Sequence, residues 1–330
     1  MSTFSVVIPV YKEEDNVLRV YERLAPVLDE LEGIGDWEIV FSLDPSPDAT
    51  EERILELRER DPRVKLLRFS RRFGQPAATL AGMAATSGGE VVVIDCDLQD
   101  PPELIPQLHA KVLEGFDVVY AQRRTREGET LPKRIVASLG YKVINRISEV
   151  DIPPNTGDFR LMTRRVVDNV VSLHESHGFL RGLVGFVGFR QTSVLYDRDA
   201  REAGQSKYNP FLGSILIGMN GVIGFSRRPL NFISVAGILL SFASFLFALI
   251  YLIFKLTGAQ NFPTGNPTIV ILVSLFSGIQ LLSLGVMGEY VGRIYDEVKQ
   301  RPRVIVESAH GIDPDAPLLR EDGVLETGRR

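Results

Sequence analysis

The stretch Val91-Val92-Val93-Ile94-Asp95-Cys96-Asp97-Leu98-Gln99-Asp100-Pro101-Pro102 changes from apolar to acidic at a single position. Its continuous apolar run is typical of a parallel strand that is buried on both faces. The two prolines that follow predict the start of a helix, since proline is tolerated in the first turn. In an open α/β sheet the ligand site lies beyond the carboxyl ends of the strands. The pattern therefore places two carboxylates, Asp95 and Asp97, at a candidate site.

Strand-like and helix-like patterns alternate on both sides of this stretch. Apolar, β-branched runs predict strands, and segments with apolar residues at helical spacing predict helices between them. This order favours an α/β fold with a Rossmann-like, mostly parallel sheet and helices on both of its faces. The predicted strands are 4–10, 37–43, 64–69, 91–94 and 116–121, with shorter ones at 159–162 and 191–195; the predicted helices are 16–31, 48–60 and 76–86.

Composition excludes several classes of protein. The chain has 330 residues, with 37 Lys and Arg against 42 Asp and Glu, and a formal net charge of −5. A general nucleic-acid binder would carry a basic excess, so no nucleic-acid partner is expected. The single cysteine, Cys96, rules out a disulfide framework and a multi-cysteine zinc site.

The second half of the chain contains two segments without Asp, Glu, Lys, Arg or His, at residues 229–254 and 256–288. About 20 apolar helical residues suffice to cross the hydrocarbon core, so spans are predicted at about 230–254 and 268–288. Arginines and lysines flank the outer ends, which the positive-inside rule assigns to the cytoplasm. Small residues four apart on these helices would allow close packing, and a homo-oligomer through them is possible.

The predicted domain organisation follows from these segments. Residues 1–207 form a cytoplasmic catalytic domain, and 208–228 form an amphipathic helix at the membrane surface, with a buried core helix as the alternative. Residues 229–292 form the transmembrane hairpin. Residues 293–330 return to the cytoplasm with one more strand at 304–306 and a loose polar tail from residue 308. The chain is thus expected to be an integral protein of the cell inner membrane with both termini in the cytoplasm.

The carboxylates at the strand end have two explanations. Two neighbouring carboxylates are costly to desolvate unless a cation compensates for them. Oxygen ligands suit Mg²⁺ or Mn²⁺, which would also bridge to a diphosphate. The alternative is a polar turn in which Asp100 caps the following helix.

Four segments together resemble one enzyme family. They are residues 5–16 (SVVIPVYKEEDN), 95–103 (DCDLQDPPE), 155–162 (NTGDFRLM) and 201–208 (REAGQSKY), followed by the two apolar segments. The combination resembles the polyisoprenyl-phosphate glycosyltransferases of the family 2, GT-A fold type. These are relatives of dolichol-phosphate mannose synthase and of the bactoprenol glucosyl transferases. The resemblance covers roughly residues 4–306.

The resemblance implies a nucleotide-sugar donor, a lipid-phosphate acceptor and inversion at the anomeric carbon. It implies roles for particular residues at the matching positions. The nucleotide would contact Pro9, Tyr11, Glu13, Asp44 and Asp95. The metal would be held by Asp97, Asp95 and Gln99, and Asp158 would lie near the reacting sugar. The acceptor phosphate or the diphosphate would contact Arg123, Arg134, Ser138, Arg201 and Lys207. Leu43, Pro45 and Arg72 depart from residues that are common in the family.

Elementary chemistry refines the expected mechanism. A phosphate monoester has a second pKa of about 6 and is largely dianionic at neutral pH, so it is already a nucleophile. We therefore expect Asp158 to position the acceptor or the sugar, with a general-base role as the alternative.

The leading hypothesis is metal-dependent transfer of glucose from UDP-glucose to a polyprenyl phosphate such as undecaprenyl phosphate. GDP-mannose, UDP-4-formamido-arabinose or an N-acetyl sugar nucleotide are alternative donors. A non-catalytic nucleotide-binding scaffold or a flippase partner is the rival from another class. The intact carboxylates Asp95, Asp97 and Asp158 argue against it, since a protein that only binds would not need them.

Overall fold

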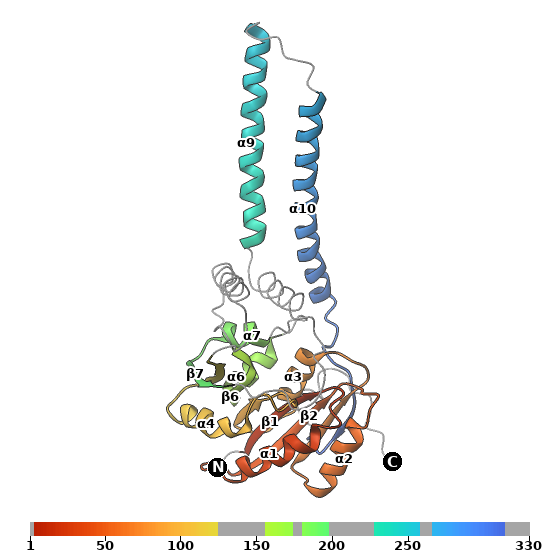
Figure 1. Ribbon diagram of the computed structural model, residues 1–330, viewed down its shortest axis with the longest axis vertical. Coiled ribbons are helices and arrows are strands. Elements are labelled where there is room, and N and C mark those ends of the chain that lie inside the picture. The colour runs from red at the N-terminus through yellow and green to blue at the C-terminus, as the bar shows by residue number, and fades with distance from the viewer. Residues whose placement is uncertain (1–2, 125–155, 174–179, 198–227, 258–265, 314–330) are drawn as a thin grey trace.

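An eight-stranded sheet organises the first and last parts of the chain (Figure 1). The computed structural model describes residues 3–124, 156–173, 180–197, 228–257 and 266–313. The strand order across the sheet is β7-β5-β6-β4-β1-β2-β3-β8. The strands are β1 (Thr3–Val10), β2 (Asp36–Leu43), β3 (Val64–Phe69), β4 (Glu90–Val93), β5 (Val118–Arg123), β6 (Thr156–Thr163), β7 (Gln191–Tyr196) and β8 (Val306–His310).

The predicted mostly parallel sheet is confirmed, with two exceptions. β4, β1, β2 and β3 run parallel to one another, and β5 is parallel to β7. β6 is antiparallel to both β4 and β5 and lies between them, and β8 is antiparallel to β3. The start of β6 therefore lies at the same edge of the sheet as the ends of β4 and β5.

Helices cover both faces of the sheet, as the sequence predicted. Apolar side chains alternate along β1: Phe4, Val6 and Ile8 point to the face covered by α1, α2 and α4, and Val7 points to the face covered by α3, α6 and α7. The helices are α1 (Val17–Asp29), α2 (Thr50–Arg60), α3 (Gln75–Ala84), the short 3₁₀ helix η1 (Pro102–Leu104), α4 (Ile105–Leu113), α6 (Arg164–Ser172) and α7 (Leu180–Val187).

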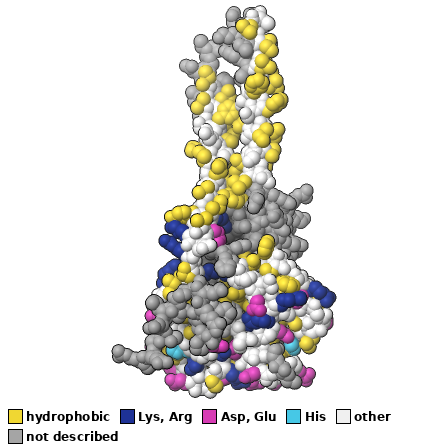
Figure 2. Space-filling view, turned by 180° about the vertical axis from the view of Figure 1, so that it is seen from behind, with side chains coloured by type: hydrophobic (Ala, Val, Ile, Leu, Met, Phe, Trp, Pro, Cys, Tyr) yellow, Lys and Arg dark blue, Asp and Glu magenta, His cyan; other side chains and the backbone are white. Residues whose placement is uncertain are grey.

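Two long helices, α9 (Arg228–Thr257) and α10 (Asn266–Val298), contact each other and extend away from the sheet (Figure 1). Many large apolar side chains on them are exposed, among them Phe232, Phe242 and Leu282. On the face shown in Figure 2, hydrophobic side chains cover these helices, whereas charged side chains gather on the domain below. Within the part of the chain that the structure describes, no helix combines the length and the apolar character needed to cross a membrane. The structure thus does not confirm the prediction of two transmembrane spans. The predicted surface helix at 208–228 lies almost wholly outside the described residues.

The segment after α10 returns to the sheet. A strand does form here, as predicted, but β8 covers Val306–His310 and not 304–306. The expectation of a loose tail from residue 308 was therefore wrong for the first residues of that tail. Val304, Val306 and Ile312 are buried against Phe69 and α3. The Ile305 carbonyl also accepts a hydrogen bond from the Ser70 amide at 2.9 Å. Burial of these apolar side chains explains why a segment with a polar composition is ordered.

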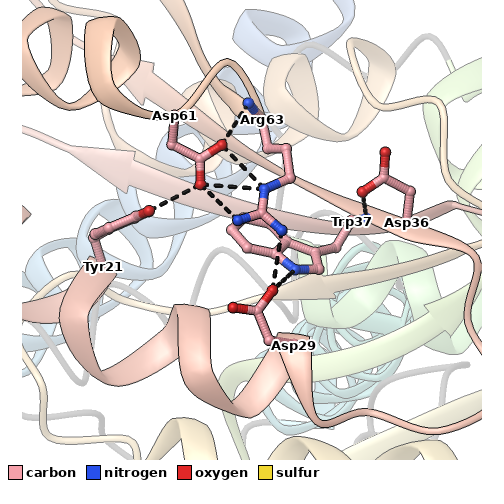
Figure 3. A network of polar contacts seen from close by, with 6 residues as sticks. All are labelled: Tyr21, Asp29, Asp36, Trp37, Asp61 and Arg63. Carbon is pink, nitrogen blue, oxygen red and sulfur yellow. Dashed lines mark hydrogen bonds and ion pairs between the residues drawn. The ribbon is translucent and has the colours of Figure 1, made fainter.

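Polar networks join the elements at the opposite edge of the sheet, where the strands begin. In Figure 3, Arg63 donates to Asp61 at 3.0 Å and 2.9 Å and to Asp29 at 3.0 Å, and its guanidinium lies 3.6 Å from the centre of the Trp37 ring. The Tyr21 hydroxyl donates to Asp61 at 2.8 Å. Burial alone would raise the pKa of Asp61, but the Arg63 guanidinium outweighs burial and lowers the pKa. Ion pairs thus hold the elements together at this edge. The candidate site lies at the other edge, at the carboxyl ends of the strands.

Candidate active site

Several of the site residues that the sequence predicted lie at the carboxyl edge of the sheet. Asp44 follows β2, Asp95 follows β4, Arg123 ends β5, and Asp158 lies near the start of β6. Because β6 runs opposite to its neighbours, its first residues lie beside the last residue of β5. A Cβ placed on Gly157 would lie 3.1 Å from Arg123 Nη2. The reversal of β6 thus brings Asp158 to the site.

The predicted nucleotide side of the site lies beyond β1 and β2. Asp44 is buried, and its two carboxylate oxygens accept hydrogen bonds from the amides of Phe73 and Gly74, each at 2.9 Å. Gly74 has a φ of 93°, a conformation that favours glycine. The Asp44 carboxylate therefore holds the loop between β3 and α3.

The chain just after β1 lies against the same loop. The Arg72 guanidinium lies 4.1 Å from the centre of the Tyr11 ring. Glu13 accepts from Asn16 Nδ2 at 2.7 Å, and its amide donates to Thr50 at 2.9 Å. Pro9 has no amide hydrogen to donate. It pairs with β2 but lies beyond Val7, the last residue of β1 that pairs with β4, so no hydrogen bond between strands is lost. This arrangement orders the segment in which the nucleotide contacts are predicted.

The acidic segment after β4 alternates between partly exposed and buried residues. Asp95, Asp97 and Gln99 are partly exposed, whereas the residues between them are buried. Gln75 donates to Asp95 Oδ1 at 2.7 Å, and the Gln99 amide donates to Asp97 Oδ1 at 3.2 Å. Leu98 has a φ of 57°, which turns the chain sharply here.

The donor chemistry of this segment fits a hard divalent cation. Its oxygen donors are two carboxylates and an amide, which are ligands that suit Mg²⁺ or Mn²⁺. Across the described ranges, no group of three His, Cys, Asp or Glu side chains could hold a metal ion. Asp95 and Asp97 therefore supply carboxylate oxygens of the right chemistry, and they stay the predicted metal ligands.

A buried chain of polar contacts lies behind the metal segment. The Tyr196 hydroxyl donates to Asp100 and accepts from Arg123 Nε at 3.2 Å, and Arg123 Nη2 lies 3.6 Å from Asp100 Oδ1. Burial alone would lower the pKa of Arg123, but Tyr196 and the carboxylates of Asp100 and Asp95 raise it. Burial and Asp100 raise the pKa of Tyr196 to about 12. Arg123 therefore stays a cation beside Asp95. The N-cap of η1 is Pro101, so the alternative in which Asp100 caps this helix is wrong, and Asp100 accepts from Tyr196 instead.

Asp158 is surrounded by guanidinium groups. Its Oδ1 accepts from Arg181 Nε at 3.0 Å and lies 3.5 Å from Nη2 of the fully buried Arg160. Burial raises the pKa of Asp158, but Arg181, Arg160 and Arg123 together bring it below its ordinary value. The carboxylate is thus held ionised, which makes it a weak proton acceptor.

Some predicted site residues cannot be placed, and others were missed. Arg134, Ser138, Arg201 and Lys207 lie outside the described residues. Sequence reasoning assigned no role to four residues that the structure brings to the site, namely Gln75, Arg160, Arg181 and Tyr196. Arg160 belongs to the quoted segment 155–162, so its position next to Asp158 was an available signal. The other three have no neighbouring motif, and only the fold brings them near.

Comparisons with known proteins identify the family of the chain. The model of the family described as Glycosyl transferase family 2 matches residues 5–171. The uncharacterized glycosyltransferase YkcC of Bacillus subtilis is 46% identical over 310 residues, which are 94% of this chain and 95% of that protein. A bactoprenol glucosyl transferase of Shigella phage SfII is 40% identical over 94% of this chain and 99% of its own.

The chain is also similar to a solved structure. Glucosyl-3-phosphoglycerate synthase of Mycobacterium tuberculosis matches 67% of this chain and 76% of its own at 20% identity, with a TM-score of 0.43. The identity and coverage of the sequence relatives, together with the match to the family model, are the basis of the assignment. The chain belongs to glycosyl transferase family 2 and is a glycosyltransferase with a GT-A type α/β fold.

Proposed function

We propose that this glycosyltransferase transfers glucose from UDP-glucose to a polyprenyl phosphate such as undecaprenyl phosphate, with Mg²⁺ or Mn²⁺ as cofactor. The observation that carries the proposal is the meeting of two kinds of charge at one edge of the sheet. Asp95 and Asp97 offer ligands for a cation, and Arg123 and Arg181 offer charge to an anion beside them. Relatives that are about 40% identical are bactoprenol glucosyl transferases, which supports the choice of sugar and acceptor.

The reaction needs a nucleophile, a leaving group and a way to hold two anions together. An oxygen of the lipid phosphate attacks C1 of glucose, the bond from C1 to UDP breaks, and UDP leaves with the electron pair. No proton has to be removed from a dianionic phosphate. A divalent cation on Asp95 and Asp97 would supply Lewis-acid stabilisation of the departing diphosphate.

The remaining tasks belong to the chain's own side chains. Gln75 orients Asp95 by its hydrogen bond at 2.7 Å. Arg123 stays charged and is oriented by Tyr196 and Asp100, so it can neutralise phosphate oxygens. Asp158, held ionised by its arginines, orders the side of the site that faces the acceptor.

A panel of donors tests the proposal. The full chain, purified in detergent, is incubated with undecaprenyl phosphate and labelled UDP-glucose, GDP-mannose, UDP-4-formamido-arabinose or UDP-N-acetyl sugars. We expect labelled lipid from UDP-glucose, and only when a divalent cation is present. Product from another donor alone would replace glucose in the proposal. Nucleotide binding without a lipid product from any donor would favour the non-catalytic scaffold or flippase partner.

We also propose that the hairpin of α9 and α10 attaches the enzyme to the cell inner membrane, with the catalytic domain in the cytoplasm. The exposed apolar side chains of both helices and the absence of charge at 229–254 and 256–288 support this proposal. After lysis of cells, alkaline carbonate should leave the protein in the membrane pellet, and a mild detergent should release it. Release by carbonate alone would contradict insertion of the hairpin.

A further inference from the structure

Arg181 reaches the site from a part of the chain that contains none of the predicted site residues. It is the second residue of α7, and its side chain is about one-quarter exposed. Its Nε donates to Asp158 Oδ1 at 3.0 Å. Among the residues that the structure describes, Asp158 is the only hydrogen-bonding partner of this guanidinium. Its two terminal nitrogens thus have no hydrogen-bonding partner within the described ranges.

Arg160 holds Asp158 from within the core. Its Nη2 donates to the Gly157 carbonyl at 2.9 Å, and its Nε donates to the Asp158 carbonyl at 3.2 Å. The side chain is fully buried, so it is not accessible to a substrate. Arg160 therefore fixes the backbone at Asp158, and the carboxylate in turn orients Arg181.

The strand order indicates which substrate Arg181 faces. Four of the five predicted nucleotide residues lie at or just after the ends of β1 and β2, and the fifth, Asp95, follows β4 together with the predicted metal ligands. β6, which carries Asp158, lies on the other side of β4 from β1. Along the carboxyl edge of the sheet, from β2 towards β6, the predicted nucleotide side comes first, then Asp95 and Asp97, and then Arg181. A group beyond the diphosphate must be the sugar or the acceptor.

We propose that Arg181 is a further residue that binds the phosphate of the lipid acceptor, and that Asp158 is the positioning residue that holds it. The inference rests on the proposed function. A guanidinium presents its donors in a planar fork, so one edge can bind a carboxylate while the other binds phosphate oxygens. Asp158 uses the Nε side of Arg181 and leaves the terminal nitrogens for the phosphate.

Steady-state kinetics of Arg181→Gln test the assignment in the full chain, with UDP-glucose and undecaprenyl phosphate as substrates. We expect KM for the lipid phosphate to rise by about 10- to 100-fold, the range for a lost charged hydrogen bond. KM for UDP-glucose should stay within about twofold, because the metal segment after β4 lies between Arg181 and the nucleotide contacts predicted beyond β1 and β2. Arg181→Lys should recover part of the loss, since it keeps the charge without the fork.

A control variant and a test of coupling complete the experiment. Arg165→Gln removes an arginine of the neighbouring helix α6 that pairs with Asp117 at 2.7 Å, and it should leave both KM values unchanged. Asp158→Asn should raise KM for the lipid, and its effect should not add to that of Arg181→Gln, because both act through one contact.

The outcomes separate this inference from the proposed function. Lipid product from the unmodified enzyme, together with an unchanged lipid KM in Arg181→Gln, would overturn the role of Arg181 alone. A rise in KM for UDP-glucose as large as that for the lipid would assign Arg181 to the donor and also overturn it. Failure of the unmodified enzyme to use any polyprenyl phosphate would overturn the proposed function and this inference together.

Discussion

Asp97→Asn should lower kcat by about 10³-fold under saturating donor and acceptor. Asp97 is one of two partly exposed carboxylates in the segment that follows β4, and the Gln99 amide donates to its Oδ1 at 3.2 Å. An amide is a weaker and uncharged ligand for a divalent cation, so the variant loses stabilisation of the leaving diphosphate. Several kcal/mol of transition-state stabilisation correspond to this factor, since about 1.4 kcal/mol changes a rate tenfold.

The measurement combines metal removal with the substitution. Dialysis against a chelator should abolish turnover of the unmodified enzyme, and added Mg²⁺ or Mn²⁺ should restore it. The variant should need a higher metal concentration for its remaining activity. Asp168→Asn changes an exposed carboxylate on α6 and should behave like the unmodified enzyme. Full activity of Asp97→Asn with an unchanged metal requirement would show that the metal is bound elsewhere.

Glu38→Ala should lower the free energy of unfolding by about 3 kcal/mol, because it breaks a buried ion pair. Glu38 is a buried residue of β2 that pairs with Lys65 of β3. It also accepts hydrogen bonds from the Ser5 hydroxyl at 2.6 Å and from the Ser87 amide at 2.6 Å. Removing the carboxylate leaves these donors without an acceptor in the sheet. Urea unfolding of the variant, followed by circular dichroism, measures the loss.

The same carboxylate predicts a dependence of stability on pH. Burial raises the pKa of Glu38, but Lys65, Ser5 and Ser87 together bring it below the ordinary value of 4.5. A group whose pKa is lower in the folded state stabilises the fold above its unfolded pKa, and this contribution is lost as the pH falls through the folded pKa. Between about pH 5 and pH 3, the unmodified enzyme should therefore lose more stability than Glu38→Gln. Equal losses in the two proteins would contradict the role of Glu38. Glu56→Gln, at an exposed position of α2, is the matched control.

Local sequence patterns were sufficient for the strands and helices of the first half. The runs at 4–10 and 64–69 match β1 and β3 closely, because alternation and apolar content are properties of neighbouring residues. The acidic segment after β4 was also recognised, since its chemistry lies within a few residues. The bounds of α9 and α10 exceed the predicted spans, because the helices continue into polar turns that a search for apolar runs leaves out.

Pairing between distant strands could not be predicted in the same way. Val93 pairs with Arg160 because β6 enters the sheet between β4 and β5, and nothing near either residue encodes that order. The position of Arg181 beside Asp158 follows from this insertion, and that of Tyr196 follows from the parallel pairing of β7 with β5. The arginine and tyrosine side of the site is therefore a product of topology, whereas the acidic side is visible as a motif.

The return of β8 to the sheet has a consequence for how the enzyme is made. The strand is encoded after both long helices, so it leaves the ribosome later than every other strand of the sheet. Until then, β3 has an open edge with unpaired amides and carbonyls, which is a template for wrong pairing. A chain that ends within α10 also lacks Val304, Val306 and Ile312, which cover α3 and Phe69. Deleting the long helices to obtain a smaller enzyme would thus require residues 304–312 to be rejoined to the catalytic domain.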